Sequence, residues 1–228
     1  MQAQFLANNP FGMNCLVVAA TVMEIMPLLE QYRAKNRLPS TIAPDILITG
    51  IGLTATTYAL TRQLQIKCPD IIIQAGVAGS FDKTISIGSV LAIKQEVIAD
   101  LSVIEKGQLK TMFDLNLLSQ NQYPFLKGWL VNKNEVLKKV KLKKVKAISV
   151  NEITTSKQKI NLYKETFTPI VESMEGAALH YVCLMEKIPF LQIRAVSNYV
   201  GERNKKNWNM KESIINLNKE LIRLLQII

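Results

Sequence analysis

Apolar runs alternate along the chain with segments of helical period. Six short runs are rich in Ile, Val and Leu and show little alternation with polar residues: residues 15–20, 45–49, 71–75, 89–94, 147–150 and 190–196. Continuous apolar runs of this length are typical of strands that are covered on both faces of a sheet. The pattern therefore predicts a buried β-sheet.

Four longer segments have apolar positions at helical spacing: residues 23–33, 53–66, 175–186 and 211–227. In the last of them Ile214, Leu217, Leu221 and Leu224 fall on one face, as in an amphipathic helix. Residues 101–129 show no clear period, which predicts a long loop with short elements. The alternation of strands and helices predicts an α/β fold, a single domain of residues 1–228 with a mixed β-sheet flanked by helices on both faces.

The composition is that of an ordinary globular protein, with 48% hydrophobic and 20% charged residues. No apolar run approaches the roughly 18 to 20 residues that are needed to cross a bilayer, so no membrane association is expected. The first twenty residues lack a basic segment before their apolar part, which argues against a secretory signal. We therefore expect a cytoplasmic protein.

The cysteines and the histidine argue against a metal site. Cys15, Cys68 and Cys183 are widely spaced and odd in number, whereas disulfide frameworks and zinc sites use pairs at short spacing. The chain has one histidine, His180. We expect free thiols in a reducing compartment, no metal and no cofactor.

The net charge of +10 raises the question of a nucleic-acid partner. Much of the charge lies in residues 133–146, which contain seven lysines and no arginine. Nucleic-acid sites usually add arginine and aromatic residues to such a run. Here the lysines alternate with valine and leucine, as on the solvated face of a surface segment, and we predict no nucleic-acid binding.

Polar residues at the ends of strands are the candidates for chemistry, because ligands of open α/β sheets bind beyond the carboxyl ends of the strands. Glu24 follows the first strand. Gly50 and Gly52 follow the second, and glycines after residue 75 follow the third, where backbone amides can approach a ligand. Taken singly, Glu24 can equally be a first-turn glutamate that complements a helix dipole, and the glycines can be tight turns.

The stretch "VESMEGAALHYVC" begins the third helix. Ser173 can cap this helix, and Glu175 enters its first turn with small residues behind it, so its carboxylate can accept hydrogen bonds from a ribose diol. A glutamate that complements the helix dipole is the alternative. His180 lies about 140° round the helix from Glu175, so a satisfied core histidine is the better interpretation.

The last predicted strand ends in a serine and an amide, Ser197 and Asn198. Arg194 lies inside the apolar part of this strand and needs an anionic or carbonyl partner if it is buried. A polar segment then reaches Trp208. Taken alone, these residues are also consistent with a turn asparagine and a core tryptophan.

Together, these segments resemble the nucleoside phosphorylase/nucleosidase superfamily over nearly the whole chain. "SMEGAALHYVC" followed by "RAVSNYVGER" is similar to the futalosine hydrolase family, nucleosidases of the alternative menaquinone pathway. The Met174-Glu175 pair and the strand end from Arg194 to Ser197 also match motifs of the methylthioadenosine/S-adenosylhomocysteine nucleosidases. The resemblance implies a nucleoside phosphorylase-like fold.

The resemblance also implies roles for individual positions. It makes Glu24 the catalytic carboxylate that holds and deprotonates the attacking water, and Glu175 the acceptor of the ribose hydroxyls, with Arg194 as structural support. The other residues expected to bind substrate are Gly79 in the glycine-rich wall, Ile153 and Thr154 near the base, Met174 against the sugar, Ser197, and Trp208 over the 5′ substituent.

Asn198 departs from the adenine-releasing members, which have aspartic acid at this position. An amide cannot supply a proton at neutral pH. Its N–H₂ group can, however, donate a hydrogen bond to N7 or O6 of a base, and its oxygen can accept one from a base N–H. Because a 6-oxopurine offers acceptors at both N7 and O6, an amide suits hypoxanthine, and Asn198 is assigned a catalytic role at the leaving base.

The function implied is hydrolysis of the N-glycosidic bond of futalosine to hypoxanthine and dehypoxanthine futalosine. A 6-oxopurine nucleoside phosphorylase, a methylthioadenosine/S-adenosylhomocysteine-type nucleosidase and a non-catalytic nucleoside-binding relative remain as alternatives. The expected partners are a small-molecule nucleoside and further copies of the chain in a homodimer or larger assembly. A partner aromatic residue is expected to close the pocket, with Phe113, Tyr123 and Phe125 as candidates.

Overall fold

The computed structural model describes residues 13–33, 44–202 and 204–227. Most of the segment that argued against a secretory signal lies outside these residues. A mixed sheet of nine strands forms the centre of the described molecule, as predicted. Its strands are β1 (Cys15–Ala19), β2 (Asp45–Ile48), β3 (Ile71–Ser80), β4 (Val90–Glu96), β7 (Phe125–Leu126), β8 (Trp129–Val131), β9 (Lys144–Ser149), β10 (Val171–Ser173) and β11 (Phe190–Tyr199).

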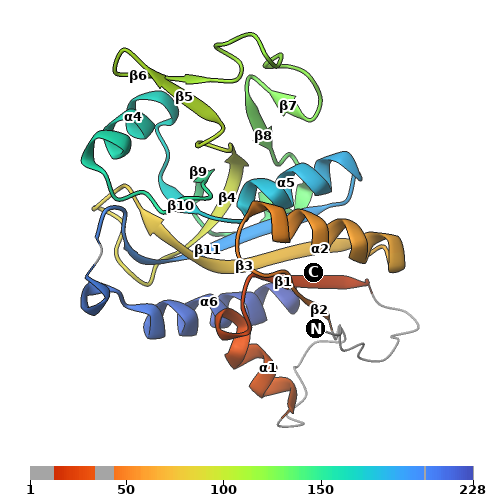
Figure 1. Cartoon of the computed structure of the whole chain (residues 1–228). Coiled ribbons are helices and arrows are strands. Elements are labelled where there is room, and N and C mark those ends of the chain that lie inside the picture. The colour runs from red at the N-terminus through yellow and green to blue at the C-terminus, as the bar shows by residue number, and fades with distance from the viewer. Residues whose placement is uncertain (1–12, 34–43, 203, 228) are drawn as a thin grey trace.

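Five of these strands close into a ring. Strand β11 runs parallel to β3 and antiparallel to β4, and the two long strands β3 and β11 lie side by side through the middle of the molecule (Figure 1). Strand β10 pairs with β3 and β9, and β9 pairs with β4, which completes the ring. The ends of β3, β10 and β11 are therefore brought together at one edge, although they are far apart in sequence.

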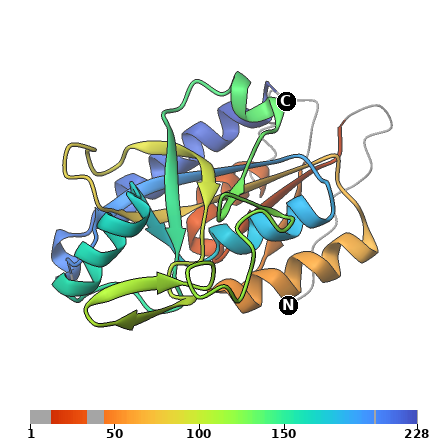
Figure 2. The same ribbon diagram turned by 90° about the horizontal axis from the view of Figure 1, so that it is seen from above.

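Helices cover both faces of the sheet, which confirms the predicted architecture (Figures 1 and 2). On one face lie α1 (Met26–Arg33) and α6 (Met210–Leu225), and on the other lie α2 (Leu53–Ile66) and α5 (Gly176–Met185). Alternate residues of a strand point to opposite faces. In β1, Cys15 and Val17 accordingly pack with α6, whereas Leu16 and Val18 pack with α2 and α5.

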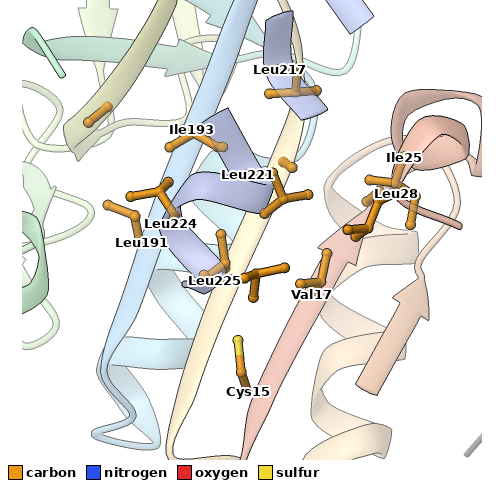
Figure 3. Close-up of a cluster of buried hydrophobic side chains, with 14 of the residues drawn as sticks. Cys15, Val17, Ile25, Leu28, Leu191, Ile193, Leu217, Leu221, Leu224 and Leu225 are labelled. Atoms are coloured by element: carbon orange, nitrogen blue, oxygen red, sulfur yellow. The ribbon is translucent and has the colours of Figure 1, made fainter. Parts of the chain in front are cut away.

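The core under α6 follows from the sequence pattern of that helix. Figure 3 shows Leu217, Leu221 and Leu224 stacked over β11 and β3, with Ile25 and Leu28 closing the cluster beside β1. All of these side chains are fully buried. Burial of one leucine contributes about 1.5–3 kcal/mol to the free energy of unfolding, so this face anchors the strands that form the ring.

Several short elements complete the described structure. The segment predicted as a long loop, residues 101–129, contains the hairpin β5 (Ser102–Glu105) and β6 (Gln108–Thr111) and the short strand β7. Two helices were not predicted, α3 (Glu135–Lys139) and α4 (Lys157–Phe167). A short 3₁₀ turn, Lys205–Asn207, precedes α6.

Strands β3 and β11 continue three or more residues past the ends that the apolar pattern indicated. Strand β3 continues to Ser80, so Gly76 and Gly79 lie inside the strand and not in a loop after it. Strand β11 continues to Tyr199, so Asn198 also lies inside a strand, beyond an irregularity in the register after Val196. The prediction was wrong here because main-chain pairing between β3 and β11 continues past the last apolar side chain.

The first predicted helix is divided. A 3₁₀ turn, Val22–Ile25, is followed by α1, which begins at Met26. Pro27 has no backbone N–H, so it cannot donate the bond that would continue one regular helix through residue 23. The prediction that Ser173 caps the helix now identified as α5 was also wrong. Ser173 belongs to β10, and Glu175 is the N-cap of α5.

The lysine-rich segment is a solvated surface, as predicted. Leu137, Val140 and Val145 are buried, whereas Lys138 and Lys144 are exposed, as are the other lysines of the run except the half-buried Lys146. Cys15 and Cys183 are buried free thiols, and Cys68 is an exposed one. Among the described residues, no helix combines the length and the apolar character that a membrane span requires.

Candidate active site

A cavity of about 300 Å³ opens where β1, β3, β10 and β11 end. Nine of the ten residues predicted for the site line it: Glu24, Gly79, Ile153, Thr154, Met174, Glu175, Ser197, Asn198 and Trp208. The tenth, Arg194, is buried behind the wall. Sequence reasoning missed the remaining lining residues, which are Ala20, Thr21, Ile51, Val77, Ala78, Glu172, Ser173, Val200, Gly201, Glu202 and Met210.

Glu24 is held by hydrogen bonds to both of its carboxylate oxygens. Thr21 donates from its backbone N–H (3.0 Å) and its hydroxyl (3.2 Å) to Oε2, and the backbone N–H of Val77 donates to Oε1 at 3.1 Å. Burial raises the pKa of Glu24, although Arg194 and these hydrogen bonds oppose the shift. The side chain therefore caps the 3₁₀ turn and also faces the cavity, where a carboxylate with a raised pKa can accept a proton.

Glu175 joins two distant parts of the chain. Its Oε1 accepts a hydrogen bond from the backbone N–H of Gly52 at 3.2 Å, and its Oε2 lies 3.3 Å from Nη1 of Arg194. Gly52 has a φ of +94°, which favours glycine and aims this N–H at the carboxylate. The glycine turn after β2 thus positions a side chain of the cavity wall.

Arg194 finds the partners that its place in an apolar strand required. It is only 1% exposed, and besides Glu175 its guanidinium donates to Oε1 of Gln74 (2.9 Å) and to the carbonyl oxygen of Val77 (3.4 Å). Gly76 leaves the space for it: a Cβ at that position would lie 2.2 Å from Nη1. The buried arginine consequently links the carboxylate of α5 to strand β3.

Asn198 is oriented by its neighbours in the chain. The hydroxyl of Ser197 donates to its Oδ1 at 2.8 Å, and its Nδ2 donates to the carbonyl oxygen of Tyr199 at 3.1 Å. Because Oδ1 accepts from a hydroxyl and Nδ2 faces a carbonyl, these contacts fix which end of the amide is the donor. Beside it, Gly79 presents no side chain, and a Cβ there would lie 3.3 Å from Nδ2.

Glu172 is an acidic residue of the cavity that the sequence analysis did not select. Its Oε1 accepts a hydrogen bond from the backbone N–H of Thr154 at 3.1 Å. Its Oε2 is closed to solvent, and a side-chain hydrogen bond from Thr154 acts to lower the pKa of this carboxyl. Burial raises the pKa of Glu172. A charged residue inside a strand between buried neighbours was the sequence signal that pointed to it.

The segment before α6 forms the outer part of the wall. Nε1 of Trp208 donates to the carbonyl oxygen of Glu202 at 3.0 Å. This hydrogen bond joins the two ends of the segment. Ile153, which also lines the cavity, is 45% exposed. These two side chains give the cavity apolar surfaces near its mouth.

Behind the cavity lies a second buried polar group. Glu96 accepts hydrogen bonds from Nε2 of Gln192 (2.9 Å) and the hydroxyl of Ser149 (3.1 Å), and burial raises its pKa to about 7. His180 is fully buried with its Nδ1 3.0 Å from the carbonyl oxygen of Leu130, and burial lowers its pKa to about 4. The core role that was predicted for His180 is confirmed.

The walls of the cavity are acidic. Among the residues that the structure describes, four glutamates line it, at positions 24, 172, 175 and 202, and no lysine or arginine does. Within the described parts of the chain, no group of three or more His, Cys, Asp or Glu side chains is arranged to hold a metal ion. Such a lining favours hydroxyl and N–H donors on the ligand atoms that it contacts.

A model of the Phosphorylase superfamily matches residues 45–228. The chain belongs to this superfamily. The match covers every strand and helix from β2 onward, and the first strand and Glu24 precede it.

Curated relatives in this superfamily share about a quarter of the residues. Futalosine hydrolase of Thermus thermophilus is 26% identical over 186 residues, which cover 78% of this chain and 80% of that protein. The 5′-methylthioadenosine/S-adenosylhomocysteine nucleosidase of Haemophilus influenzae is also 26% identical, over 192 residues that cover 78% of this chain and 82% of that protein. The two kinds of relative are equally similar.

Solved structures share the fold. The nucleosidase of Neisseria meningitidis in complex with methylthio-immucillin-A has a TM-score of 0.77 at 17% identity, covering 95% of this chain and 100% of that one. Futalosine hydrolase of Helicobacter pylori has a TM-score of 0.76 at 18% identity, covering 95% and 98%. At this identity the likeness establishes the nucleoside phosphorylase-like fold.

Proposed function

We propose that this chain is a purine nucleosidase that hydrolyses the N-glycosidic bond of 6-oxopurine ribosides, with futalosine as its substrate. The observation that carries the proposal is the convergence of Glu24, Glu175 and Asn198 on one cavity from three distant parts of the chain. The curated relatives support the reaction class, because both kinds named above are nucleosidases.

Glu24 would act as the general base. Its carboxylate would take a proton from a water molecule whose oxygen attacks C1′ of the ribose, while the bond from C1′ to the base nitrogen breaks. The electron pair of that bond leaves with the base, which finally acquires the proton that the water gave up. The raised pKa of this buried carboxylate brings it nearer to the pH at which a base is effective.

Glu175 would bind the ribose. A carboxylate can accept two hydrogen bonds from the 2′- and 3′-hydroxyls, and such bonds to a charged acceptor are strong. The Arg194 contact and the Gly52 N–H hold the carboxylate in place before substrate arrives. Met174, which precedes it in the wall, would pack against the sugar.

Asn198 would stabilise the leaving base as negative charge collects on it. In the structure its Nδ2 donates a hydrogen bond to the carbonyl oxygen of Tyr199. On substrate binding, Nδ2 would donate a hydrogen bond to N7 or O6 of a 6-oxopurine, in place of this bond or in addition to it. An amide offers no proton to transfer, so this site would work by hydrogen bonding to the acceptors of a 6-oxopurine.

The acidic lining favours hydrolysis over phosphorolysis. A phosphorylase needs a site for phosphate, and the described part of the cavity wall carries four glutamates and no cationic side chain. The backbone N–H of Val77, which an anion would use, is already bonded to Glu24. A phosphate dianion beside these carboxylates would be repelled.

Product analysis tests the proposal. Purified protein is given futalosine, inosine and methylthioadenosine in parallel, each with and without inorganic phosphate, and released base and sugar are separated by chromatography. We expect hypoxanthine and a free reducing sugar from futalosine at a rate that phosphate does not change. Ribose 1-phosphate products would instead indicate a phosphorylase, adenine release alone the methylthioadenosine-type nucleosidase, and no release from any substrate a binding protein.

A further inference from the structure

Asn218 is a buried amide in the apolar face of α6. It is only 1% exposed, and Leu217 beside it and Leu221 one turn further are fully buried in the core under this helix (Figure 3). Taking an amide out of water costs free energy unless its groups are hydrogen-bonded. An amide at this place in the core therefore needs specific partners.

The partners of Asn218 lie mostly in a distant part of the chain. Its Nδ2 donates to the carbonyl oxygens of Glu24 (2.8 Å) and Ile214 (2.7 Å), and its Oδ1 accepts from the backbone N–H of Leu28 at 3.2 Å. Both N–H groups and the oxygen of the amide are thus used, which fixes its orientation. Helix α6 is thereby hydrogen-bonded to the turn that carries Glu24.

The amide occupies a break in a helical hydrogen-bond pattern. In a continuous α-helix the N–H of Leu28 would donate to the carbonyl of Glu24, four residues before it. Here α1 begins only at Met26, and Pro27 has no N–H to offer to that carbonyl. Asn218 bonds to both groups, and a side chain inserted in this way interrupts a helix. The break between the 3₁₀ turn and α1 is therefore held from α6.

This break lies next to the carboxylate that faces the cavity. The main-chain carbonyl of Glu24 is bound by Asn218, and Oε1 of its side chain accepts from the N–H of Val77 on β3 at 3.1 Å. The two ends of one residue thus have separate anchors, on α6 and on the sheet. With both in place, the carboxylate has little freedom to leave the cavity wall.

The same helix is also bonded to the other side of the site. The hydroxyl of Ser213, which is fully buried on α6, donates to the carbonyl oxygen of Val196 at 2.8 Å. Val196 lies two residues before Asn198 on β11. One helix consequently holds the main chain beside the carboxylate and beside the amide of the same cavity.

We propose that Asn218 is a positioning residue for Glu24: its amide holds the main chain of the 3₁₀ turn so that the carboxylate faces the attacking water. This role rests on the proposed function, in which Glu24 is the base. Asn218 does not line the cavity and touches no substrate, so it acts only through the residue that it holds.

Asn218→Ala removes the amide and adds no charge. We expect kcat for futalosine to fall about 10- to 100-fold, because a misplacement of about 1 Å at a reacting group has a cost of this size. KM should stay within about twofold of the wild type, since Glu24 would contact the water and not the nucleoside. A rise in KM with an unchanged kcat would overturn the role.

Asn216→Ala is the matched control. Asn216 is a half-buried asparagine of the same helix, and its Nδ2 also donates to a main-chain carbonyl, that of Gly88 at 3.1 Å. Its kcat should equal that of the wild type. An equal fall of kcat in both variants would show a general effect of loosening α6 and would overturn the role of Asn218.

A double-variant cycle separates positioning from stability. If Asn218 acts through Glu24, then adding Asn218→Ala to Glu24→Gln should lower the single-turnover rate by less than about twofold. The same 10- to 100-fold loss in both backgrounds, to within about twofold, would contradict the proposal, because the asparagine would then act on something other than the carboxylate.

The amide of Val77 reports the position of Glu24 without any turnover, because it donates to Oε1. In ¹⁵N-labelled Asn218→Ala we expect its exchange with solvent to accelerate at least about 10-fold, while the amide of Ile72 on the same strand, bonded to the carbonyl of Pro189, keeps its rate. Asn216→Ala should change neither. An unaltered Val77 amide in Asn218→Ala would overturn the proposal.

Asn218→Ser covers the case in which the alanine variant does not fold. A serine hydroxyl on a helix can bond the carbonyl four residues earlier, here that of Ile214, but it is too short to reach Glu24 as well. The same fall in kcat and the same change at Val77 are expected. If the wild type cleaves no nucleoside, the proposed function fails, and the Val77 amide still decides whether Asn218 holds Glu24.

Discussion

The guanidinium of Arg194 lies 3.3 Å from the carboxylate of Glu175, and both side chains are almost completely removed from water. The same guanidinium binds Gln74 at 2.9 Å on β3. One buried charge therefore ties the N-cap of α5 to the central strand. Because a buried charge without a partner is costly, the arginine and the glutamate stabilise the fold only as a pair.

Arg194→Lys is expected to lower both stability and activity. A lysine keeps the charge but has no planar fork, so it cannot reach Glu175, Gln74 and the carbonyl of Val77 together. We expect the free energy of unfolding in urea to fall by about 2–4 kcal/mol and the KM for the nucleoside to rise. The control is Arg223→Lys, which alters a partly exposed ion pair on α6 and should cost less than about 1 kcal/mol. Similar losses in the two variants would contradict this account.

Glu24→Gln is expected to remove the base that activates water. The rate of the chemical step should fall about 10²- to 10⁴-fold, while the affinity for hypoxanthine changes little, because Glu24 would contact the water and not the base. In the wild type the rate should rise with pH as Glu24 ionises, and the midpoint should lie above the ordinary value of 4.5 since burial raises this pKa.

This pH dependence supplies the readout for Glu24. The acidic limb of the pH–rate profile should be lost in Glu24→Gln and retained in Glu30→Gln, whose carboxylate lies on the exposed side of α1. Near-normal turnover in Glu24→Gln would remove this residue from the mechanism.

Asn198→Asp is expected to make activity depend on acid. One carboxylate oxygen would face the carbonyl of Tyr199, which now accepts from Nδ2 at 3.1 Å, so the charged form would be disfavoured. At pH 8 the kcat/KM for inosine should fall at least about 10-fold through loss of the donor to the base. As pH decreases, the protonated carboxyl regains a donor and part of the rate should return. A pH-independent loss would argue against a hydrogen bond from this residue to the base.

Glu96→Gln is expected to flatten the dependence of stability on pH. Burial raises the pKa of Glu96 to about 7, so the folded protein holds a proton that the unfolded chain releases above about 4.5. The folded state binds more protons in this interval, so stability is full below the unfolded pKa and decreases as pH rises towards 7. Urea unfolding of the wild type should show the free energy of unfolding decreasing between pH 4.5 and 7. In the variant this decrease should be smaller by on the order of 1–3 kcal/mol. Parallel curves for the two proteins would show that Glu96 does not titrate there.

The pattern of apolar and polar residues was sufficient to predict the helices and strands whose burial depends on residues close to them in sequence. The amphipathic stripe of α6 and the largely apolar runs of β1 and β11 identified their elements, and α2 has the predicted bounds of residues 53–66. Apolar pattern alone failed where pairing or chain geometry took over. It ended β3 five residues early, and it merged the 3₁₀ turn at Glu24 with α1 although Pro27 interrupts the hydrogen bonding.

The candidate site divides in the same way. Glu24, Glu175 and Asn198 were selectable from sequence because each is a polar residue at a strand end or helix start, and the family resemblance joined them. Glu172 was not selected, because what places it in the cavity wall is its pairing with Gly79 of β3 and the hydrogen bond from the backbone N–H of Thr154. Neither property is visible in the residues next to it.

The amino-acid sequence by itself determined which segments are buried, that the sheet is covered on both faces, and which polar side chains stand where strands end, because these depend on neighbours within a few residues. Tertiary structure alone decided that β3, β10 and β11 end at one edge, that Arg194 stands behind Glu175, and that an acid and an amide flank one glycine. The reason is that strand register joins residues dozens of positions apart, through main-chain hydrogen bonds that carry no mark in the side-chain sequence.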